Sequence, residues 1–288
     1  MKVLVLDTVG VVGHAVAQYF IDSGHTVLGF GEQESPICKT FVGSYYDLDF
    51  ITSVISNEQF DAVINCVAVI NQDAEKDKSS ASYINTFLPH FLAKITKGTK
   101  TVLVHRSTDC IFSGKKGSYT LQDEPDAESF YAKTKALGEV VNEKDITIRT
   151  SLIGPELDEN GQSLFNWFFN QTGNVNGFAN AIWTGLTTIE FAKEIEYLLK
   201  EKKHGLLQCV PEEKPLSKYE LLLLFEEFFP MNRKVVKIEN KLVDKSLLPQ
   251  LSDSGLKISS YRQMIKEMLE FIKKHKNLYS HYFKGEEK

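Results

Sequence analysis

The chain has 288 residues, of which 42% are hydrophobic and 25% are charged, and its formal net charge is -5. This ordinary globular composition excludes disorder, collagen-like repeats and low complexity as descriptions of the whole chain. The acidic balance disfavours a nucleic-acid partner. No apolar run reaches the roughly 18 residues that span a bilayer, so we expect no membrane segment. The short apolar start lacks a cleavage motif and is not expected to be a signal peptide.

The cysteine content also limits the function classes. The four cysteines have no C-x-x-C spacing and no clustered histidines beside them; they are Cys38, Cys66, Cys110 and Cys209. A zinc site or a disulfide framework needs such spacing. We therefore expect no bound metal and a reducing, cytoplasmic location.

The first half of the chain alternates short β-branched runs with longer amphipathic stretches. Strands are predicted at 3–6, 26–30, 62–66, 101–105 and 146–150, and helices at 11–23, 48–57, 79–95 and 128–142. Pro89 should kink or split the third of these helices. Continuous apolar strands that alternate with helices indicate βαβ crossovers and a parallel sheet buried on both faces. The sequence therefore predicts a doubly wound α/β fold of the Rossmann type.

The pattern becomes less regular after about residue 152. Helices are predicted at 163–171, 188–200, 217–229 and 261–274, short strands at 205–210 and 234–239, and a frayed tail at 281–288. We divide the chain into two regions, 1–154 and 155–288. The first would bind a dinucleotide and carry the catalytic residues. The second region is a smaller α/β annex that would bind the substrate and can return strands or helices to the first domain.

A glycine-containing turn follows the first predicted strand. Gly10 and Gly13 have the spacing of a dinucleotide-binding turn, in which the backbone of Gly10, Val11, Val12 and Gly13 would approach a pyrophosphate. The position of the first glycine of such a turn holds Asp7, whose carboxylate we expect to repel the pyrophosphate and whose backbone tolerates unusual angles less well. The alternative is that the glycines serve only helix packing.

The end of the second strand does not decide between NADH and NADPH. Glu32 could accept a hydrogen bond from a ribose hydroxyl, although it lies slightly late in the sequence. No arginine follows that would bind a 2′-phosphate. Both cofactors stay open.

Three residues provide a hydroxyl, a phenol and an amine, which together suit the reduction of a carbonyl group. Tyr131 and Lys135 are four residues apart on a predicted helix, so both lie on one face. An ammonium beside a phenol would lower the pKa of Tyr131 towards neutrality and make it a proton donor. The Thr108 hydroxyl, at the end of a parallel strand, could bind the same carbonyl oxygen. The alternative is a solvated Tyr/Lys helix face.

Three segments resemble the extended short-chain dehydrogenase/reductases, and within them the dTDP-4-dehydrorhamnose reductase group. They are Ser107 to Thr120, Tyr131 to Glu139, and Arg149 to Gly154. The resemblance implies that Thr108, Tyr131 and Lys135 form the catalytic triad and that Lys135 also binds the nicotinamide ribose. It implies that Asn85 completes an active-site tetrad near the cofactor, the alternative being an ordinary helix-surface asparagine.

Two further segments depart from the pattern of this group. The stretch Cys66, Val67 and Ala68 replaces an alanine-rich segment, and its backbone should still line the cofactor. Cys110 replaces an aromatic residue after Thr108 and Asp109. We interpret Asp109 and Cys110 as lining the substrate pocket, and the alternatives for Cys110 are an epimerisation base or a simply buried thiol.

The annex is rich in aromatic residues, most of which should be core. Asn166, Asn170, Asn176 and Asn180 interleave with them and could bind a sugar or a base. Trp183 begins a segment that, by the resemblance, closes on the substrate, although the proline of the group is missing.

The resemblance implies reduction of the 4-keto group of a dTDP- or UDP-linked 4-keto-6-deoxyhexose by NADPH or NADH, for a surface polysaccharide. Cys110 suggests a second hypothesis, a combined 3,5-epimerase and 4-reductase. A third is a non-catalytic binding subunit, because the family also contains a regulatory partner of methionine adenosyltransferase and Asp7 would fit a degenerate cofactor loop. A homodimer is left open.

Overall fold

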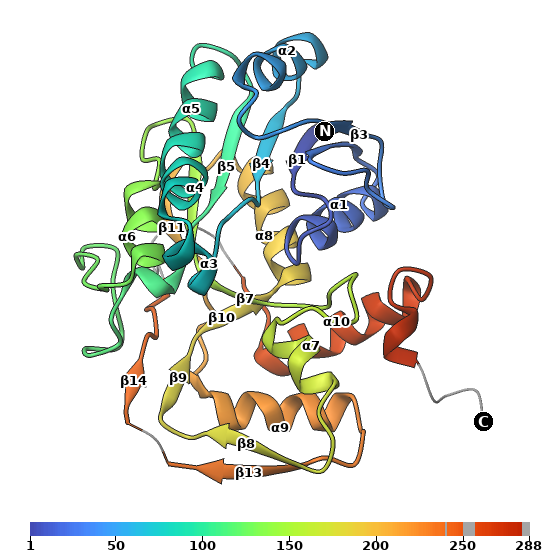
Figure 1. Ribbon diagram of the computed structural model, residues 1–288, viewed down its shortest axis with the longest axis vertical. Coiled ribbons are helices and arrows are strands. Elements are labelled where there is room, and N and C mark those ends of the chain that lie inside the picture. The colour runs from blue at the N-terminus through green and yellow to red at the C-terminus, as the bar shows by residue number, and fades with distance from the viewer. Residues whose placement is uncertain (240, 250–256, 284–288) are drawn as a thin grey trace.

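The computed structural model describes residues 1–239, 241–249 and 257–283. Its centre is a seven-stranded, fully parallel sheet in the order β3-β2-β1-β4-β5-β6-β11 (Figure 1). The strands are β1 (Lys2–Leu6), β2 (Thr26–Gly31), β3 (Thr40–Val42), β4 (Ala62–Asn65), β5 (Val102–Arg106), β6 (Ile146–Arg149) and β11 (Gly205–Gln208). The predicted doubly wound parallel fold is confirmed, and β3 is an additional short edge strand.

Both faces of the sheet are buried, as the apolar strands predict. Val3 and Val5 pack into one cluster with α1 (Gly13–Asp22) and α8 (Thr188–Lys200). Leu4 and Leu6, which point the other way, pack with α2 (Leu48–Glu58) and α5 (Leu88–Ile95). Alternate residues of a strand face opposite sides, so one apolar run serves both layers.

The segment predicted as a helix at 79–95 is helical throughout, with a π-helical turn directly before α5 rather than a break at Pro89. It consists of α4 (Lys78–Ser82), a π-helical turn η1 (Tyr83–Phe87) and α5. Pro89 lies in the first turn of α5, and because it has no N–H it cannot donate to the preceding turn, where the π turn lies. A π turn inside a helix frequently marks a functional site.

The helix predicted at 128–142 is shorter, as α6 (Phe130–Leu137). It begins where the Ser129 hydroxyl accepts the Ala132 N–H, and it ends at Gly138. A Cβ on Gly138 would lie 1.8 Å from the Asn85 carbonyl oxygen, so η1 approaches the helix end too closely for any side chain. This tertiary contact is invisible in the local sequence pattern.

The second half contains α7 (Leu164–Phe169), α9 (Lys218–Phe228) and α10 (Tyr261–Lys274), and the predicted bounds of α8 and α10 are correct. Three small sheets were not predicted in full. They pair β7 (Ser151–Ile153) with β10 (Gly185–Thr187), β9 (Ala181–Trp183) with β12 (Leu216–Ser217) and β14 (Val243–Asp244), and β8 (Asn174–Phe178) with β13 (Lys234–Ile238). Most of these strands are two or three residues long, too short for a sequence period.

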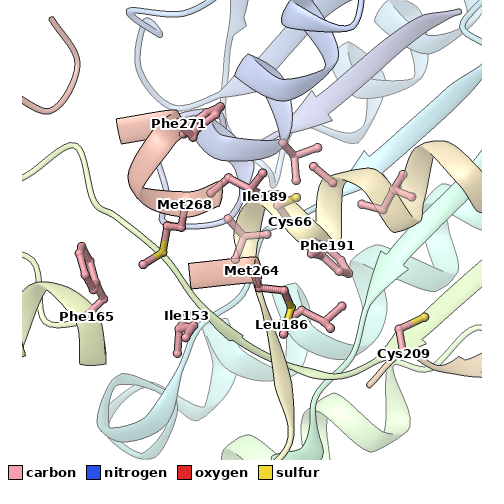
Figure 2. Packing of buried hydrophobic residues seen from close by; sticks show 14 of the residues in the cluster. Cys66, Ile153, Phe165, Leu186, Ile189, Phe191, Cys209, Met264, Met268 and Phe271 are labelled. Carbon is pink, nitrogen blue, oxygen red and sulfur yellow. The ribbon is translucent and has the colours of Figure 1, made fainter. Parts of the chain in front are cut away.

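The two halves share one apolar cluster. Figure 2 shows Cys66 and Ile153 of the first half beside Leu186, Ile189 and Met264 of the second. β11 joins the main sheet beside β6, and α8 packs on the sheet beside α1. The second half of the chain therefore returns both a strand and a helix to the first. The division at residue 154 stays a prediction.

The predicted fraying of the tail is wrong for its first residues, and 284–288 lie outside the described residues. Ser280–Phe283 form a short 3-10 helix in which Tyr282 is buried. The Tyr282 hydroxyl donates to Asn166 Oδ1 at 2.7 Å and accepts the Glu156 N–H at 3.0 Å. In the described part of the chain, no helix is long and apolar enough to cross a bilayer.

A buried ion pair ties together the elements that will form the site. Arg149 at the end of β6 donates from Nε and Nη2 to the two carboxylate oxygens of Glu139, both at 2.7 Å. The Ser107 hydroxyl, just after β5, donates to Glu139 Oε1 at 2.6 Å. The side chains of Arg149 and Glu139 are only 5% and 7% exposed. We call these three residues the Glu139 clamp.

Arg149→Met should strongly destabilise the protein, because it leaves the Glu139 carboxylate buried without its cation. Breaking a buried pair in this way costs about 3–5 kcal/mol. Thermal unfolding should show a drop of several degrees, whereas Arg262→Met, which breaks the exposed pair with Glu227, should change the midpoint little. Equal midpoints for the two variants would contradict this account of the clamp.

Candidate active site

The carboxyl ends of β1, β4 and β5 converge on one edge of the sheet. Because the strands are parallel, the residues that follow them lie together: Asp7 after β1, Cys66 after β4, and Ser107 and Thr108 after β5. β1 and β4 are neighbours at which the direction of winding reverses, and ligands of doubly wound folds bind at such a switch point.

Asp7 adopts the backbone conformation that a glycine would otherwise take. Its φ is +68°, in the left-handed region, and its N–H donates to the Phe30 carbonyl at 2.9 Å. Among non-glycine residues, asparagine and aspartate tolerate this region best, so the expected backbone difficulty is accommodated. Gly13 is required by close approach, because a Cβ there would lie 2.0 Å from the Asp7 carbonyl oxygen.

The Asp7 carboxylate folds back over the turn. The Gly10 N–H donates to Asp7 Oδ1 at 3.1 Å, and a Cβ on Gly10 would lie 2.1 Å from Asp7 Oδ2. Burial raises the pKa of Asp7 to about 6, although the Gly10 N–H and the charge of Arg106 act to lower it. The carboxyl group therefore changes charge near neutral pH. It does so while it accepts the Gly10 N–H of the predicted phosphate-binding turn.

Thr108 begins a short 3-10 helix, Asp109–Ile111, in which its hydroxyl oxygen accepts the Cys110 N–H at 3.1 Å. Its hydroxyl hydrogen points to Asp109 Oδ1 at 3.3 Å and so is held only weakly. Asp109 is buried, which raises the pKa of its carboxyl. Burial, followed by the neighbouring Asp109 charge, raises the pKa of the Cys110 thiol to about 11.

Tyr131 lies in the first turn of α6 and packs against Cys110 and Ala74 of α3 (Asn71–Lys76). The expectation that Lys135 lowers its pKa is wrong for this structure. Burial raises the pKa of Tyr131 to about 12, and the groups that oppose this are the Arg106 guanidinium and the Thr108 hydroxyl. Thr108 and Tyr131 are therefore brought together as predicted, with burial as the main influence on the pKa of the phenol.

Lys135 is fully buried, with 0% of the residue exposed. Its Nζ donates to the Arg106 carbonyl oxygen at 2.7 Å and lies 3.4 Å from His105 Nε2. Burial and the charge of Arg106 lower the pKa of Lys135 well below its ordinary value. The amine thus lies beneath the end of β5.

Asn85 is not the helix-surface residue that one alternative expected, because 0% of it is exposed. In η1, its Oδ1 accepts the Val69 N–H at 3.0 Å and its Nδ2 donates to the Val69 carbonyl at 2.8 Å. The carboxamide therefore holds the segment after β4, which contains the predicted cofactor-lining residues Cys66, Val67 and Ala68. Direct contact of Asn85 with a cofactor stays a prediction.

The annex residues are mostly structural. Trp183 is 4% exposed, and its Nε1–H donates to Ser151 Oγ at 2.8 Å, which joins β9 to β7. Asn166 is buried and donates to the carbonyls of Glu159 and Gly161. Among the aromatic residues of the annex, Trp167 and Phe178 are exposed. Substrate contact by Trp183 stays a prediction.

Three polar residues that organise the site were not predicted from the sequence: His105, Arg106 and Glu139. A signal existed, because His105 and Arg106 interrupt an otherwise apolar strand. The Arg106 Nη2 donates to the Cys66 carbonyl at 3.3 Å, and its buried Nε has no hydrogen-bond partner among the described residues. Such a buried donor without a partner suits an anionic or carbonyl ligand.

Comparison with known proteins gives close agreement in fold and partial agreement in sequence. The dTDP-4-dehydrorhamnose reductase of Mycolicibacterium smegmatis is 30% identical over 141 residues, 48% of this chain and 40% of that protein. Methionine adenosyltransferase 2 subunit beta of Rattus norvegicus is 26% identical over 184 residues, 62% of this chain and 55% of that protein. The chain thus spans about half the length of the curated relatives it matches.

A solved structure has the same architecture throughout. The dTDP-4-dehydrorhamnose reductase of Bacillus anthracis, in complex with NADP, superimposes with a TM-score of 0.78 over 94% of this chain and 99% of that chain, at 18% identity. At this identity the likeness concerns the fold. The model of the RmlD substrate binding domain family matches residues 1–177, which include the glycine turn, Thr108 and Tyr131. Because this match covers more than half of the chain, the protein belongs to the RmlD substrate binding domain family.

Proposed function

We propose that the protein is an NAD(P)H-dependent reductase of the 4-keto group of a nucleotide-linked 4-keto-6-deoxyhexose. The observation that carries the proposal is the meeting of Thr108 and Tyr131 beside the glycine turn at the switch point of the sheet. A hydroxyl and a phenol side by side can hold and protonate one carbonyl oxygen. Family membership and the names of the relatives support the substrate class.

The chemistry divides among a few side chains of this chain. Thr108 donates its weakly held hydroxyl hydrogen to the sugar O4, and Tyr131 delivers a proton to the same oxygen as negative charge develops there. Bound NAD(P)H supplies the hydride. The raised pKa of Tyr131 keeps the phenol protonated at neutral pH, which is the form that a proton donor needs.

The residues at the strand ends fit a dinucleotide with one departure. The turn 10–13 passes close under the end of β1, and Arg106 offers a buried donor and a positive charge. Asp7 departs, because its carboxylate already occupies the Gly10 N–H. We infer that Gly10, Val11, Val12 and Gly13 line the pyrophosphate, that Cys66, Val67 and Ala68 line the nicotinamide side, and that Asp109 and Cys110 line the sugar.

The epimerase alternative is weaker on these observations. A thiol removes a proton from carbon only as the thiolate, and the pKa of Cys110, raised to about 11, keeps it a thiol at neutral pH. The pocket-lining interpretation of Cys110 therefore stands as the proposal.

A non-catalytic subunit is favoured by one specific observation, the likeness to methionine adenosyltransferase 2 subunit beta. A binding module has no need of the Thr108, Tyr131 and Lys135 constellation, which is complete here. Consumption of a 4-keto nucleotide sugar together with NADH or NADPH decides between the two functions.

Tyr131→Phe should lower the rate of 4-keto reduction by a factor on the order of 10² or more, because it removes the proton donor and keeps the ring. Cofactor affinity, measured by fluorescence titration, should persist. The matched control is Tyr46→Phe, because Tyr46 is 51% exposed on the surface. Near-full activity of Tyr131→Phe would remove Tyr131 from the mechanism.

Cofactor binding should depend on pH through Asp7. With a pKa of about 6, this carboxyl is charged at pH 8 and largely protonated at pH 5, so the dissociation constant of NADH or NADPH should fall as the pH is lowered. Asp7→Asn keeps the left-handed backbone and removes the charge. It should tighten binding at pH 8 by up to about tenfold, or roughly 1.4 kcal/mol, and flatten the pH dependence.

The control for this experiment is Glu270→Gln, an exposed carboxyl on α10 that pairs with Lys266. It should leave both the affinity and its pH dependence unchanged. Weaker binding by Asp7→Asn at pH 8 would mean that the carboxylate is accommodated rather than repulsive.

Cys110→Ser should leave the hydride step within about tenfold, since nothing in the proposed reduction needs a thiolate. In deuterated water, the wild-type product should carry no label at sugar C3 or C5. Label in the wild-type product that disappears in Cys110→Ser would instead establish the epimerase.

A further inference from the structure

The residue that follows the last glycine of the cofactor turn, His14, is buried at the start of α1, with 0% of it exposed. Its Nδ1 lies 2.8 Å from the carbonyl oxygen of Gly10, and its Nε2 lies 2.9 Å from the hydroxyl of Tyr279. Tyr279 belongs to the segment that follows α10 and is also 0% exposed. One imidazole ring therefore joins the predicted cofactor turn to a residue far away in the sequence.

The hydrogen-bond partners of His14 assign its proton. A carbonyl oxygen can only accept, so the Nδ1 that faces Gly10 carries the proton. Burial lowers the pKa of His14 to about 4, although the bond to Gly10 acts to raise it, so the ring is neutral at neutral pH and has a single N–H. Nε2 is then an acceptor, and the Tyr279 hydroxyl donates to it. Tyr279 thereby selects the tautomer that can bind Gly10.

Gly10 is held on both sides of its backbone. Its N–H donates to Asp7 Oδ1 at 3.1 Å, and its carbonyl accepts from the His14 ring and, at 3.2 Å, from the His14 N–H. In a trans peptide, the carbonyl oxygen and the N–H of the next residue point in opposite directions. Because the Gly10 carbonyl is turned toward His14, the Val11 N–H is turned away from it. Anions at such turns bind to backbone N–H groups, so the direction of these groups decides how well a pyrophosphate is held.

The segment that supplies Tyr279 is fixed by contacts of its own. Figure 1 shows the end of α10 and the residues after it near α1. His275 Nε2 lies 2.8 Å from Asp22 Oδ2 at the end of α1. Beyond Tyr279, the Tyr282 hydroxyl donates to Asn166 at 2.7 Å. Both contacts lie outside the cofactor turn, so we expect the segment to stay in place when its bond to the turn is removed.

We infer that His14 and Tyr279 are positioning residues of the cofactor turn. Tyr279 holds His14 with its proton on Nδ1, and His14 holds the Gly10 carbonyl so that the Val11 N–H is directed to the pyrophosphate. The inference rests on the proposed function for the identity of the ligand, which is NADH or NADPH. The tautomer of His14 does not depend on that function.

The first test reads the tautomer directly and needs no ligand. In the full chain labelled with 15N-histidine, the His14 signals are identified by their loss in His14→Asn. At neutral pH they should report a proton on Nδ1 and none on Nε2. The Nε2 signal should move in Tyr279→Phe, which removes its donor. A proton on Nε2, or an imidazolium, overturns the inference.

The second test compares two carboxamides in place of His14. In His14→Asn, the amide nitrogen is as many bonds from the backbone as the imidazole Nδ1, so it can still donate to the Gly10 carbonyl. In His14→Gln, the amide nitrogen reaches toward Tyr279 instead. By fluorescence titration, His14→Asn should bind NADH and NADPH within about threefold of the wild type, and His14→Gln about tenfold more weakly. Equal affinities of the two variants overturn the role of His14.

The third test measures the coupling of the pair. Tyr279→Phe should weaken cofactor binding by about threefold or more, and it should have no further effect in combination with His14→Phe, which offers the hydroxyl no nitrogen. In reduction assays, Tyr279→Phe should raise the KM for the cofactor and leave kcat at saturating cofactor within about threefold. Independent effects of the two substitutions, or a lower kcat with an unchanged KM, overturn the inference.

The matched control is Tyr282→Phe, which loosens the same segment without touching His14. It should lower the thermal midpoint, because the hydrogen bond to Asn166 is lost, and leave the cofactor affinity unchanged. Weaker cofactor binding in Tyr282→Phe would show that any damage to the segment has this effect, and it would overturn the specific role of Tyr279.

Two further outcomes are kept apart. Where His14→Phe fails to fold, the affinities of His14→Asn, His14→Gln and Tyr279→Phe decide the role of the pair. A wild-type protein that binds NADH or NADPH and has no 4-ketoreductase activity would refute the proposed function alone. The histidine signals and the cofactor affinities would then still decide whether His14 positions the turn.

Discussion

The geometry of the site depends on the buried Glu139 clamp. Glu139 follows α6, Ser107 follows β5, and Arg149 ends β6, so one carboxylate joins the three segments that carry or support the reacting groups. A buried carboxylate needs a full set of donors, and here two come from a guanidinium in bidentate geometry. Thr108 and Tyr131 belong to the segments so joined. Their meeting therefore follows from one satisfied charge as much as from apolar packing.

Below the clamp, polar side chains replace apolar ones at the ends of the central strands. Asn65, His105 and Lys135 form a line of hydrogen bonds that starts from the Val67 N–H and ends on the Arg106 carbonyl. In a medium of low dielectric constant, such a network is rigid when every member is satisfied and costly when one is removed. The network thus fixes the end of β5.

Two side chains of opposite charge lie at the predicted cofactor-binding edge of the sheet. Asp7 places a carboxylate on the glycine turn, and Arg106 brings a guanidinium close enough to favour the ionised carboxylate. Burial of Asp7 has the larger effect, so its pKa is still raised. We interpret Arg106 as partly compensating the negative charge that Asp7 introduces beside the predicted pyrophosphate position.

The sequence by itself determined the parallel α/β fold, because the hydrophobicity pattern of each strand and helix indicates which of its faces is buried. It also determined the ends of α8 and α10 and the close turn at Gly13. Each of these follows from spacing within a short stretch of chain.

The tertiary structure alone decided the end of α6, which the Asn85 carbonyl imposes on Gly138 from a distant segment, and the ordering of Tyr282 against Asn166. It also decided the pKa of Tyr131, which burial raises. The spacing of Tyr131 and Lys135 predicts a lysine charge beside the phenol, but the pKa of a buried amine depends on desolvation and on the groups packed around it. One of those groups, Arg106, comes from another strand, and its effect exists only once the chain is folded.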